Sequence, residues 1–336
     1  MENSLICLQT GSTDPCYNLA FEETVLTSRT EGNYLILWQN DKTVVIGQNQ
    51  NAAAEINRKF VEENGIRVVR RSTGGGAVYH DLGNLNYSFI SDAGDAQTLQ
   101  KEQFTLPVVK ALQKLGLDAE LSGRNDILVS GKKVSGTAQR ILGKRILYHG
   151  TLLFDSDLSM VSRALQVDPS KFRSKGIGSV RSRVGNIRAF LKVDMDMPSF
   201  WSYMKNELLQ GRAAEDTLSP AELSAVKDLQ RSKYGSWDWT YGRSPEFEYA
   251  NKEKFPGGLL EVRLSAAAGR ITQIRFYGDF LSAAPLDPVQ DALRGCPLQV
   301  QEVTAVLSRF PLPLYFGSIR REEIIDTLFG ACGTLP

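Results

Sequence analysis

The residues best suited to chemistry are concentrated in Arg70–Asp81, which reads RRSTGGGAVYHD. Three consecutive glycines remove every Cβ atom from one stretch, so the backbone can approach a ligand closely and point N–H groups at it. The guanidinium groups of Arg70 and Arg71 can pair with phosphate or carboxylate oxygens. The segment therefore predicts an anion-binding loop, although a tight turn with solvated arginines has the same signature. It contains neither a Walker A motif nor a dinucleotide-binding fingerprint.

A second concentration of polar residues, GRNDILVSGKKVSGTAQR, spans residues 123–140. Gly131-Lys132 is a predicted hairpin turn, so Lys133 opens the returning strand and Ser135 follows on the same face. A lysine beside small residues can bring its ammonium against a ligand without steric obstruction. The alternative is a solvent-facing hairpin lysine, which is the expected fate of Lys132.

Signals for metal or acid–base chemistry are sparse. Asn125 and Asp126 could cap the hairpin or bind Mg²⁺ through a carboxylate. His80 and His149 are the only histidines, and without an HExxH motif they do not predict a zinc site. Packing or supporting roles are favoured for them over general-base catalysis. GxSxG is absent and the four cysteines lack an activating neighbourhood, so no serine or cysteine nucleophile is predicted.

The stretch Lys171–Arg188 is rich in lysine and arginine and has no acidic residue. It carries one aromatic residue, Phe172, and the whole chain has a formal net charge of +1, so nucleic-acid binding is not favoured. A contact surface for an acidic partner, a phosphate-covering segment and a plain solvated face all remain open.

Short elements must hold these groups in place. Asp14-Pro15 predicts a helix start with apolar residues through Leu26, and Glu55–Asn64 and Leu106–Leu115 predict two more helices. The predicted strands are Leu5–Leu8, Tyr34–Trp38, Thr43–Gly47, Ile66–Arg70, Ala77–His80, Leu85–Ile90 and Ile146–Phe154. Tyr34–Trp38 and Thr43–Gly47 are expected to pair through a turn at Asn40-Asp41. Several links are too short for crossover helices, so we expect a mixed, largely antiparallel sheet flanked by helices.

The later part of the chain changes character. Ser219–Glu222 is a capping box that opens a helix, and Gly258–Ser265 with Arg270–Tyr277 predicts a hairpin. A boundary near residue 247 divides the chain into a catalytic domain of residues 1–246 and a smaller α+β domain of residues 247–336. The predicted fold class is therefore α+β, with a second, smaller α+β domain.

Composition and charge limit the functional classes. The chain has 336 residues with 42% hydrophobic and 23% charged residues, which is typical of a globular protein with a sizeable core. The four cysteines have no CxxC spacing, and no apolar run approaches the length of a membrane span. We expect a cytoplasmic protein that binds neither nucleic acid nor membrane. Nothing in the sequence demands a dimer, so a monomer is expected.

Three motifs together resemble the lipoate–protein ligases: RRSTGGGAVYHD, GRNDILVSGKKVSGTAQR and YHGTLLF, in this order. The later segments SVRSRVGNI and WDWTYGRSPEF extend the resemblance over essentially the whole chain. The resemblance implies a fold shared with biotin ligases plus a small accessory C-terminal domain. It also implies two half-reactions: lipoate and ATP form lipoyl-adenylate and pyrophosphate, and the lipoyl group then passes to a lysine of a carrier domain.

The resemblance also implies cofactors, partners and residue roles. ATP and Mg²⁺ are the implied cofactors, with lipoic acid and lipoyl carrier domains as partners, including E2 subunits of 2-oxoacid dehydrogenases and the glycine cleavage H protein. Lys133 is the implied catalytic residue, which contacts both the acyl carbonyl and the phosphate. The implied nucleotide contacts are Arg71, Gly76, Ala77, Val78, Tyr79, Asn125, Asp126 and Lys133. The implied contacts around lipoate or its adenylate are Arg70, Ser72, Lys133, Arg140 and His149. No residue is assigned as a dedicated metal ligand.

The acyl chain needs apolar surroundings, and Leu19, Phe21 and Trp38 are candidates, with ordinary core packing as the alternative. Two rival functions remain open. One is a lipoyl or octanoyl transferase that takes a preactivated acyl group; its cysteine-dependent branches are disfavoured because no cysteine lies within the matched motifs. The other is a non-catalytic binder of lipoate or lipoyl-adenylate.

Overall fold

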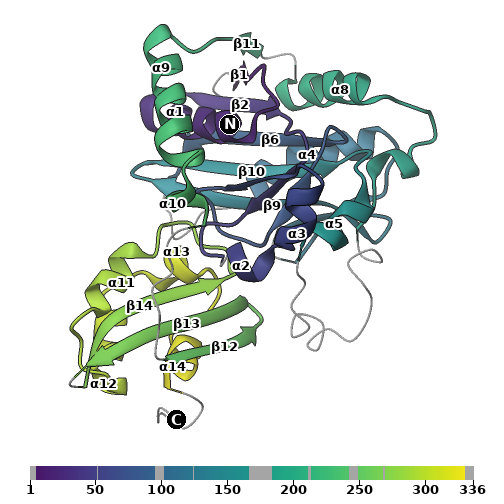
Figure 1. Ribbon diagram of the computed structural model, residues 1–336. Helices are drawn as coiled ribbons and strands as arrows, with labels where there is room; N and C mark the ends of the chain where they lie inside the picture. Colours follow the sequence, from purple (N-terminus) through teal and green to yellow (C-terminus); the bar gives the residue numbers. More distant parts are fainter. Residues whose placement is uncertain are drawn as a thin grey trace.

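The computed structural model describes residues 5–50, 52–94, 102–123, 125–165, 184–210, 213–241, 249–267 and 269–329. Within these ranges the strands form one sheet of eight strands and two sheets of three (Figure 1). The eight-stranded sheet and one small sheet belong to the N-terminal part, and the other small sheet belongs to the C-terminal part.

The large sheet supplies one wall of the candidate site. Its strands are β1 (Leu5–Gln9), β2 (Asn33–Trp38), β6 (Asn84–Asp92), β7 (Ala119–Ser122), β8 (Asp126–Val129), β9 (Lys132–Leu142), β10 (Arg145–Leu153) and β11 (Ala213–Glu215). They lie in the order β11-β1-β2-β6-β10-β9-β8-β7. β1 pairs in parallel with β11 and β2, and every neighbouring pair from β2 to β7 is antiparallel.

Helices cover both faces of this sheet. The helices α4 (Glu102–Lys114) and α8 (Met197–Leu209) pack on one face and α1 (Pro15–Ser28) on the other, with α9 (Pro220–Leu229) and the helical turn η2 (Gln230–Tyr234) packed on α1. The helices α2 (Ala52–Glu55), α3 (Arg58–Glu63) and α5 (Leu158–Ala164) pack instead in the core of the smaller N-terminal sheet. The remaining short elements are α10 (Trp237–Thr240) and the helical turn η1 (Ile187–Phe190). Alternation along β2 explains the two layers, because successive side chains of a strand face opposite sides. Leu35 and Leu37 pack in the core with α4 and α8, whereas Ile36 and Trp38 pack in the core with α1.

The second sheet holds the glycine-rich loop. It contains β3 (Thr43–Ile46), β4 (Arg67–Arg70) and β5 (Val78–His80), with β3 between the other two. β4 and β5 both pair with β3, so the segment between them, including Gly74–Gly76, is fixed at both ends.

Three local predictions were wrong. β2 and β3 do not form a hairpin: they belong to different sheets, and Asn40 is fully buried with its side chain bonded to Asn18 and His80. The predicted helix Glu55–Asn64 begins later, as α3 at Arg58, because the Asn57 side chain caps it there, and Glu55 is instead the last residue of α2. The turn before β9 is formed by Ser130 and Gly131 and not by Gly131 and Lys132. Ser130 and Gly131 have positive φ angles of 49° and 76°, and Val129 pairs with Lys132.

The C-terminal part is a smaller α+β unit. Its strands β12 (Tyr249–Phe255), β13 (Gly258–Ala267) and β14 (Arg270–Gly278) form an antiparallel sheet, and its helices are α11 (Asp287–Leu293), α12 (Val300–Leu307), α13 (Leu312–Phe316) and α14 (Arg321–Phe329). It has its own apolar core, in which Phe280 and Phe316 are fully buried. The predicted fold class, a mixed and largely antiparallel sheet with helices and a second, smaller α+β domain, is confirmed. The boundary at residues 246 and 247 lies outside the described residues and stays a prediction.

The segment after β14, residues 279–283, lies against the glycine-rich loop of the N-terminal part. The amide of Gly75 donates to the carbonyl of Phe280 at 3.1 Å, and the Asn49 side chain donates to the Ser282 hydroxyl at 2.8 Å. A Cβ atom on Gly74 would fall 2.5 Å from the amide nitrogen of Ser282. Glycine at position 74 is therefore required by the close approach of these two backbones.

Candidate active site

Two adjoining cavities lie between the glycine-rich loop and strands β9 and β10. The first has a volume of about 140 Å³ and the second about 290 Å³. Both are lined by Gly76, Ala77, Val78, Lys133, Gly136 and Thr151. The first also has apolar walls from Leu19, Trp38, Val45 and Ala138, together with polar groups of Arg71, His80, Asn86, Asn125 and His149. The second extends to Tyr79, Ser135, Val161, Leu165, Val184 and Asp279.

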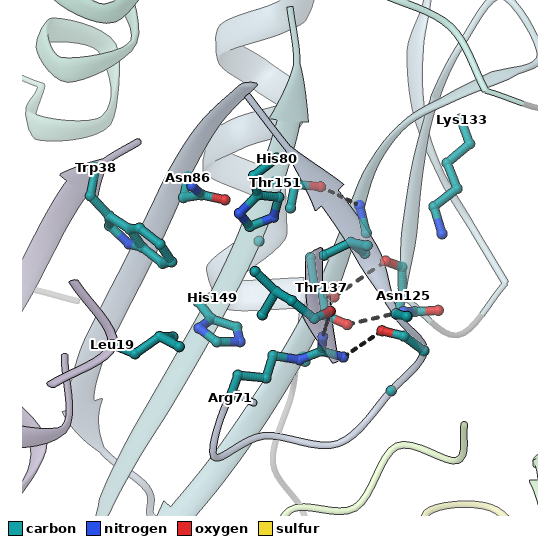
Figure 2. A pocket seen from close by; sticks show the side chains of 18 residues that line it. Leu19, Trp38, Arg71, His80, Asn86, Asn125, Lys133, Thr137, His149 and Thr151 are labelled. Atoms are coloured by element: carbon teal, nitrogen blue, oxygen red, sulfur yellow. Dashed lines mark hydrogen bonds between the residues drawn. The ribbon is translucent and has the colours of Figure 1, made fainter. Parts of the chain in front are cut away.

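Lys133 stands where the two cavities meet. Its side chain is about a third exposed, and its Nζ lies 2.6 Å from Oδ1 of Asp126, whose side chain is similarly exposed. Gly136 leaves space for it, because a Cβ at that position would come within 3.2 Å of Nζ. Figure 2 shows Lys133 and Asn125 on one side of the first cavity and Trp38 and Leu19 on the other. The ammonium is therefore available to a ligand that extends through both cavities.

Arg71 is hydrogen-bonded mainly to the glycine-rich loop, with one further bond to the carbonyl of Val45 at 3.2 Å. Its guanidinium donates to the carbonyls of Gly74 and Gly76 at 2.6 and 2.8 Å, and to the Thr73 hydroxyl at 3.0 Å. Burial lowers the pKa of Arg71 to about 10, with Glu22 opposing and Arg70 adding to that effect, so the group is still charged at neutral pH. Because the carbonyls of Gly74 and Gly76 turn toward this cation, Arg71 sets the conformation of the loop.

Arg70 has a similar structural environment outside the cavities. Its guanidinium donates to five backbone carbonyls, those of Gly47, Gln48, Gln50, Trp239 and Thr240, at 2.6–3.2 Å. Burial lowers the pKa of Arg70 to about 10. The side chain joins the loop after β3 to the end of α10.

His149 is part of a buried hydrogen-bond chain beneath the first cavity. Its Nδ1 lies 3.0 Å from the Glu22 carboxylate, and its Nε2 lies 2.8 Å from the Thr73 hydroxyl. Glu22 also accepts from Ser88, whose hydroxyl accepts from Trp38 Nε1 at 2.8 Å. Both ring nitrogens of His149 therefore have partners inside the protein, and the chain connects the wall at Trp38 to Arg71.

The structure brings together most of the residues predicted from the sequence. Arg71, Gly76, Ala77, Val78, Asn125, Lys133 and His149 line the first cavity, Tyr79 lines the second, and Asp126 pairs with Lys133. Of the predicted acyl-chain residues, Leu19 and Trp38 line the first cavity, and Phe21 is a buried core residue that lines neither. Arg124 and most of Lys171–Arg188 lie outside the described residues.

Three predicted contacts are not at the cavities. Arg70, Ser72 and Arg140 line neither of them. Arg140 pairs with Glu23 at 3.1 Å, in a cluster with Lys233 and Tyr234. Their contacts with an acyl-adenylate stay predictions.

Sequence reasoning missed Glu22, Asn86 and Thr151. Glu22 and Asn86 come from a helix and a strand without a motif, and Thr151 lies within YHGTLLF but was not singled out there. Only the pairing of β6 with β10 places Asn86 and Thr151 opposite each other. In the part of the chain that the structure describes, no cluster of three or more histidine, cysteine, aspartate or glutamate side chains could hold a metal ion. No described helix is long and apolar enough to cross a membrane.

Comparison with known proteins places the chain in a family. The model of the lipoyl protein ligase A/B catalytic domain matches residues 14–209, and that of the bacterial lipoate protein ligase C-terminus matches residues 244–328. A lipoate–protein ligase of Bacillus subtilis is 42% identical over 322 residues, covering 94% of this chain and 97% of the relative. The chain belongs to the lipoate–protein ligase family. A lipoate–protein ligase of Staphylococcus aureus is 39% identical, with 93% and 96% of the two chains covered.

Solved ligase structures agree with the fold. P. falciparum LipL1, in complex with lipoate, superposes with a TM-score of 0.77 at 21% identity, covering 91% of this chain and 94% of that one. A lipoate–protein ligase A bound with ATP is 32% identical, with a TM-score of 0.59 over 72% of this chain and 99% of its own. A bipartite ligase of Thermoplasma acidophilum, described with its E2 lipoyl domain, is 33% identical, with a TM-score of 0.62 over 74% of this chain and all of its own. The sequence-based prediction of a lipoate–protein ligase is confirmed.

Proposed function

We propose that this ligase binds lipoate in the first cavity and ATP in the second, and that Lys133 acts on the atoms that react between them. The observation that carries the proposal is the position of Lys133, which lines both cavities. Leu19, Trp38 and Val45 give the first cavity the apolar walls that an acyl chain requires. The second is larger and includes the backbone of Gly76–Tyr79, whose N–H groups suit a nucleotide.

The chemistry explains why a cation stands at the junction. A carboxylate is a poor acyl donor, so its oxygen first attacks the α-phosphate of ATP and pyrophosphate leaves. Negative charge accumulates as two anions come together, and the Lys133 ammonium neutralises it. The amine of a carrier lysine then attacks the acyl carbonyl, and AMP leaves. The product is an amide between the lipoyl group and the carrier lysine.

Asp126, the ion-pair partner of Lys133, is a carboxylate that would hold Mg²⁺ beside the proposed reacting atoms. Mg²⁺ in nucleotide sites binds through one or two carboxylates together with phosphate oxygens, and Asp126 is the direct neighbour of Lys133. When bound, the ion would neutralise phosphate charge beside Lys133. Asn125, which lines the first cavity and donates to the carbonyl of Thr137 at 3.0 Å, holds this end of β8 against β9.

A cysteine-dependent transferase has less support. Among the described residues, no cysteine lines either cavity. Burial, with Asp14 beside it, raises the pKa of Cys16 to about 11, and burial also raises the pKa of Cys7, so neither is a ready nucleophile. The three described cysteines are free.

The test is incubation of the full chain with lipoate and a lipoyl carrier domain, with and without Mg²⁺-ATP. An E2 lipoyl domain and a glycine cleavage H protein serve as the two carriers. A mass gain equal to one lipoyl group that requires ATP supports the proposal. Gain only with preformed lipoyl-adenylate would show a transferase, and no gain under either condition would show a binder.

A further inference from the structure

The first cavity contains two buried polar side chains whose hydrogen-bonding capacity is not satisfied by the protein. His80 is 3% exposed and Asn86 is 2% exposed, and both line the cavity (Figure 2). In the described part of the chain, neither Nε2 of His80 nor Nδ2 of Asn86 has a hydrogen-bond partner. Buried polar groups are almost always paired, so two such groups in one cavity suggest that a ligand supplies the partner.

The hydrogen bonds around His80 identify which nitrogen carries the proton. Asn18 Nδ2 faces only acceptors, the carbonyls of Ser12 and Gln39 and the side-chain oxygen of Asn40. Asn40 therefore presents its NH₂ group to His80, whose Nδ1 lies 3.2 Å away and must accept. Because burial keeps the ring neutral, Nε2 carries the remaining proton and is a donor. The two histidines of the cavity differ in this respect, since both nitrogens of His149 have partners.

Asn86 is a second donor beside the first. Its side-chain oxygen accepts from the Asn84 amide at 3.0 Å, which leaves the Nδ2 hydrogens without an acceptor. The ring of Trp38 lies 6.2 Å from that of His80, in an edge-on arrangement, with its own N–H directed to Ser88. The wall of the cavity on the Trp38 side thus presents N–H groups beside an apolar face.

The far end of the acyl group must match this wall. If the carboxyl group lies at Lys133, as proposed above, the distal end of the acyl chain extends toward Trp38, His80 and Asn86. We propose that the N–H groups of His80 and Asn86 recognise the dithiolane sulfurs and make the enzyme prefer lipoate to sulfur-free acids of the same size. Sulfur is a weak hydrogen-bond acceptor, whereas the methyl end of octanoate or a carbocycle accepts nothing and leaves both donors buried and unpaired.

The decisive comparison uses two acids of the same shape. 5-Cyclopentylpentanoate has the chain length and ring size of lipoate, with methylene groups in place of both sulfurs. Its ring is at least as apolar, so hydrophobic transfer alone does not favour lipoate. For the wild-type protein we expect kcat/KM in acid-dependent ATP–pyrophosphate exchange to be roughly 10-fold higher with lipoate, because the carbocycle leaves the buried donors unpaired.

Variants assign the preference to the two donors. His80→Phe and Asn86→Leu keep the side-chain size and remove one donor each, and each is expected to reduce the ratio to about 3-fold. Val45→Ala is the matched control: it removes an apolar group from the same cavity, so kcat/KM should fall for both acids while the ratio is retained. The two-acid comparison on the wild-type protein needs no variant, so it holds even where a variant fails to fold.

Equal kcat/KM for the two acids in the wild-type protein would overturn the inference. So would an unchanged ratio in both His80→Phe and Asn86→Leu. An absence of exchange with either acid is a different result: it would overturn the proposed function on which the inference rests, and the inference with it.

Discussion

The arginines of the glycine-rich loop and the lysine of the β8–β9 hairpin look equally available in the sequence, but the structure uses them differently. Arg70 and Arg71 are nine-tenths or more buried, and backbone carbonyls accept most of their hydrogen bonds. Lys133 is about a third exposed at the junction of the two cavities. Arginine's fork of donors can satisfy several carbonyls at once, whereas a lysine ammonium on a flexible stem can move with a ligand. The arginines therefore build the site, and the lysine is available to the reaction.

The largest effect expected is on folding and concerns Arg70. Arg70→Met leaves five carbonyls around the side chain without their donor, so the free energy of unfolding should fall by about 3–5 kcal/mol. Denaturant unfolding followed by tryptophan fluorescence measures this, because all four tryptophans precede residue 246. Arg70→Lys should restore little, since one ammonium cannot reach five acceptors. A loss below about 1 kcal/mol in Arg70→Met would contradict the structural role.

A pair of glycine variants sharpens the comparison within the loop. A Cβ on Gly47 would lie 2.0 Å from the carbonyl oxygen of Gly75, so Gly47→Ala must shift the backbone and should cost about 1–3 kcal/mol of unfolding free energy. Gly76→Ala is the matched variant, because its Cβ would meet nothing closer than 3.8 Å; we expect a change within about 0.5 kcal/mol. Equal losses in the same denaturant assay would mean that the contact between Gly47 and Gly75 does not fix the loop.

The pH dependence of the unfolding free energy tests whether His80 is buried and neutral. Burial, with smaller effects of Arg71 and His149, lowers the pKa of His80 to about 3 from an ordinary value near 6.5. Between these values the unfolded chain binds a proton that the folded chain does not, so stability is complete above about pH 6.5 and falls as the pH decreases toward 3. His80→Phe removes this contribution. Between about pH 3 and pH 6.5, the slope of unfolding free energy against pH should be smaller in His80→Phe than in wild type, by about 1.4 kcal/mol per pH unit.

Unfolding curves at several pH values between 4.5 and 7 provide this measurement, with the same tryptophan fluorescence. Parallel pH profiles of wild type and His80→Phe would contradict a neutral, buried His80.

The smallest effect is expected for Arg140. It lies outside the cavities and pairs with Glu23, which keeps Lys233 and Tyr234 as partners when Arg140 is lost. Arg140→Met should therefore change KM for lipoate and ATP by less than about 2-fold and reduce stability by about 1 kcal/mol. A large rise in either KM would instead place Arg140 at the acyl-adenylate, as the resemblance to the family implies.

Local signals in the sequence predicted the parts whose physics is local. The three glycines, the proline after Asp14 and the capping box at Ser219 each determine a turn or helix start, and the structure has all three elements. Pairing between distant segments was not predictable from these signals. The strand pair β2–β3 failed because β1 and β6 occupy both edges of β2, and nothing near Asn40 shows that its side chain is buried.

The same limit applied to the site. Lys133 and Gly76–Val78 were found because their neighbours form a motif, whereas Asn86 lines the first cavity only because β6 pairs with β10, and Glu22 of α1 reaches the site only through its hydrogen bond to His149. The hydrogen bonds of Arg70 to backbone carbonyls also depend on the path of residues 47–50 and 239–240, which are distant from it in the sequence. A basic residue next to glycines looks the same whether it binds a ligand or the backbone.

The most direct test of the account is lipoate-dependent ATP–pyrophosphate exchange by Lys133→Ala, measured beside its unfolding curve. The side chain is partly exposed and its ion pair with Asp126 is solvated, so we expect stability within about 0.5 kcal/mol of wild type. Exchange should fall by roughly 10²–10³-fold, because the charge that develops at the α-phosphate loses its cation. Exchange at the wild-type rate in a folded Lys133→Ala protein would contradict the account and remove Lys133 from the reaction.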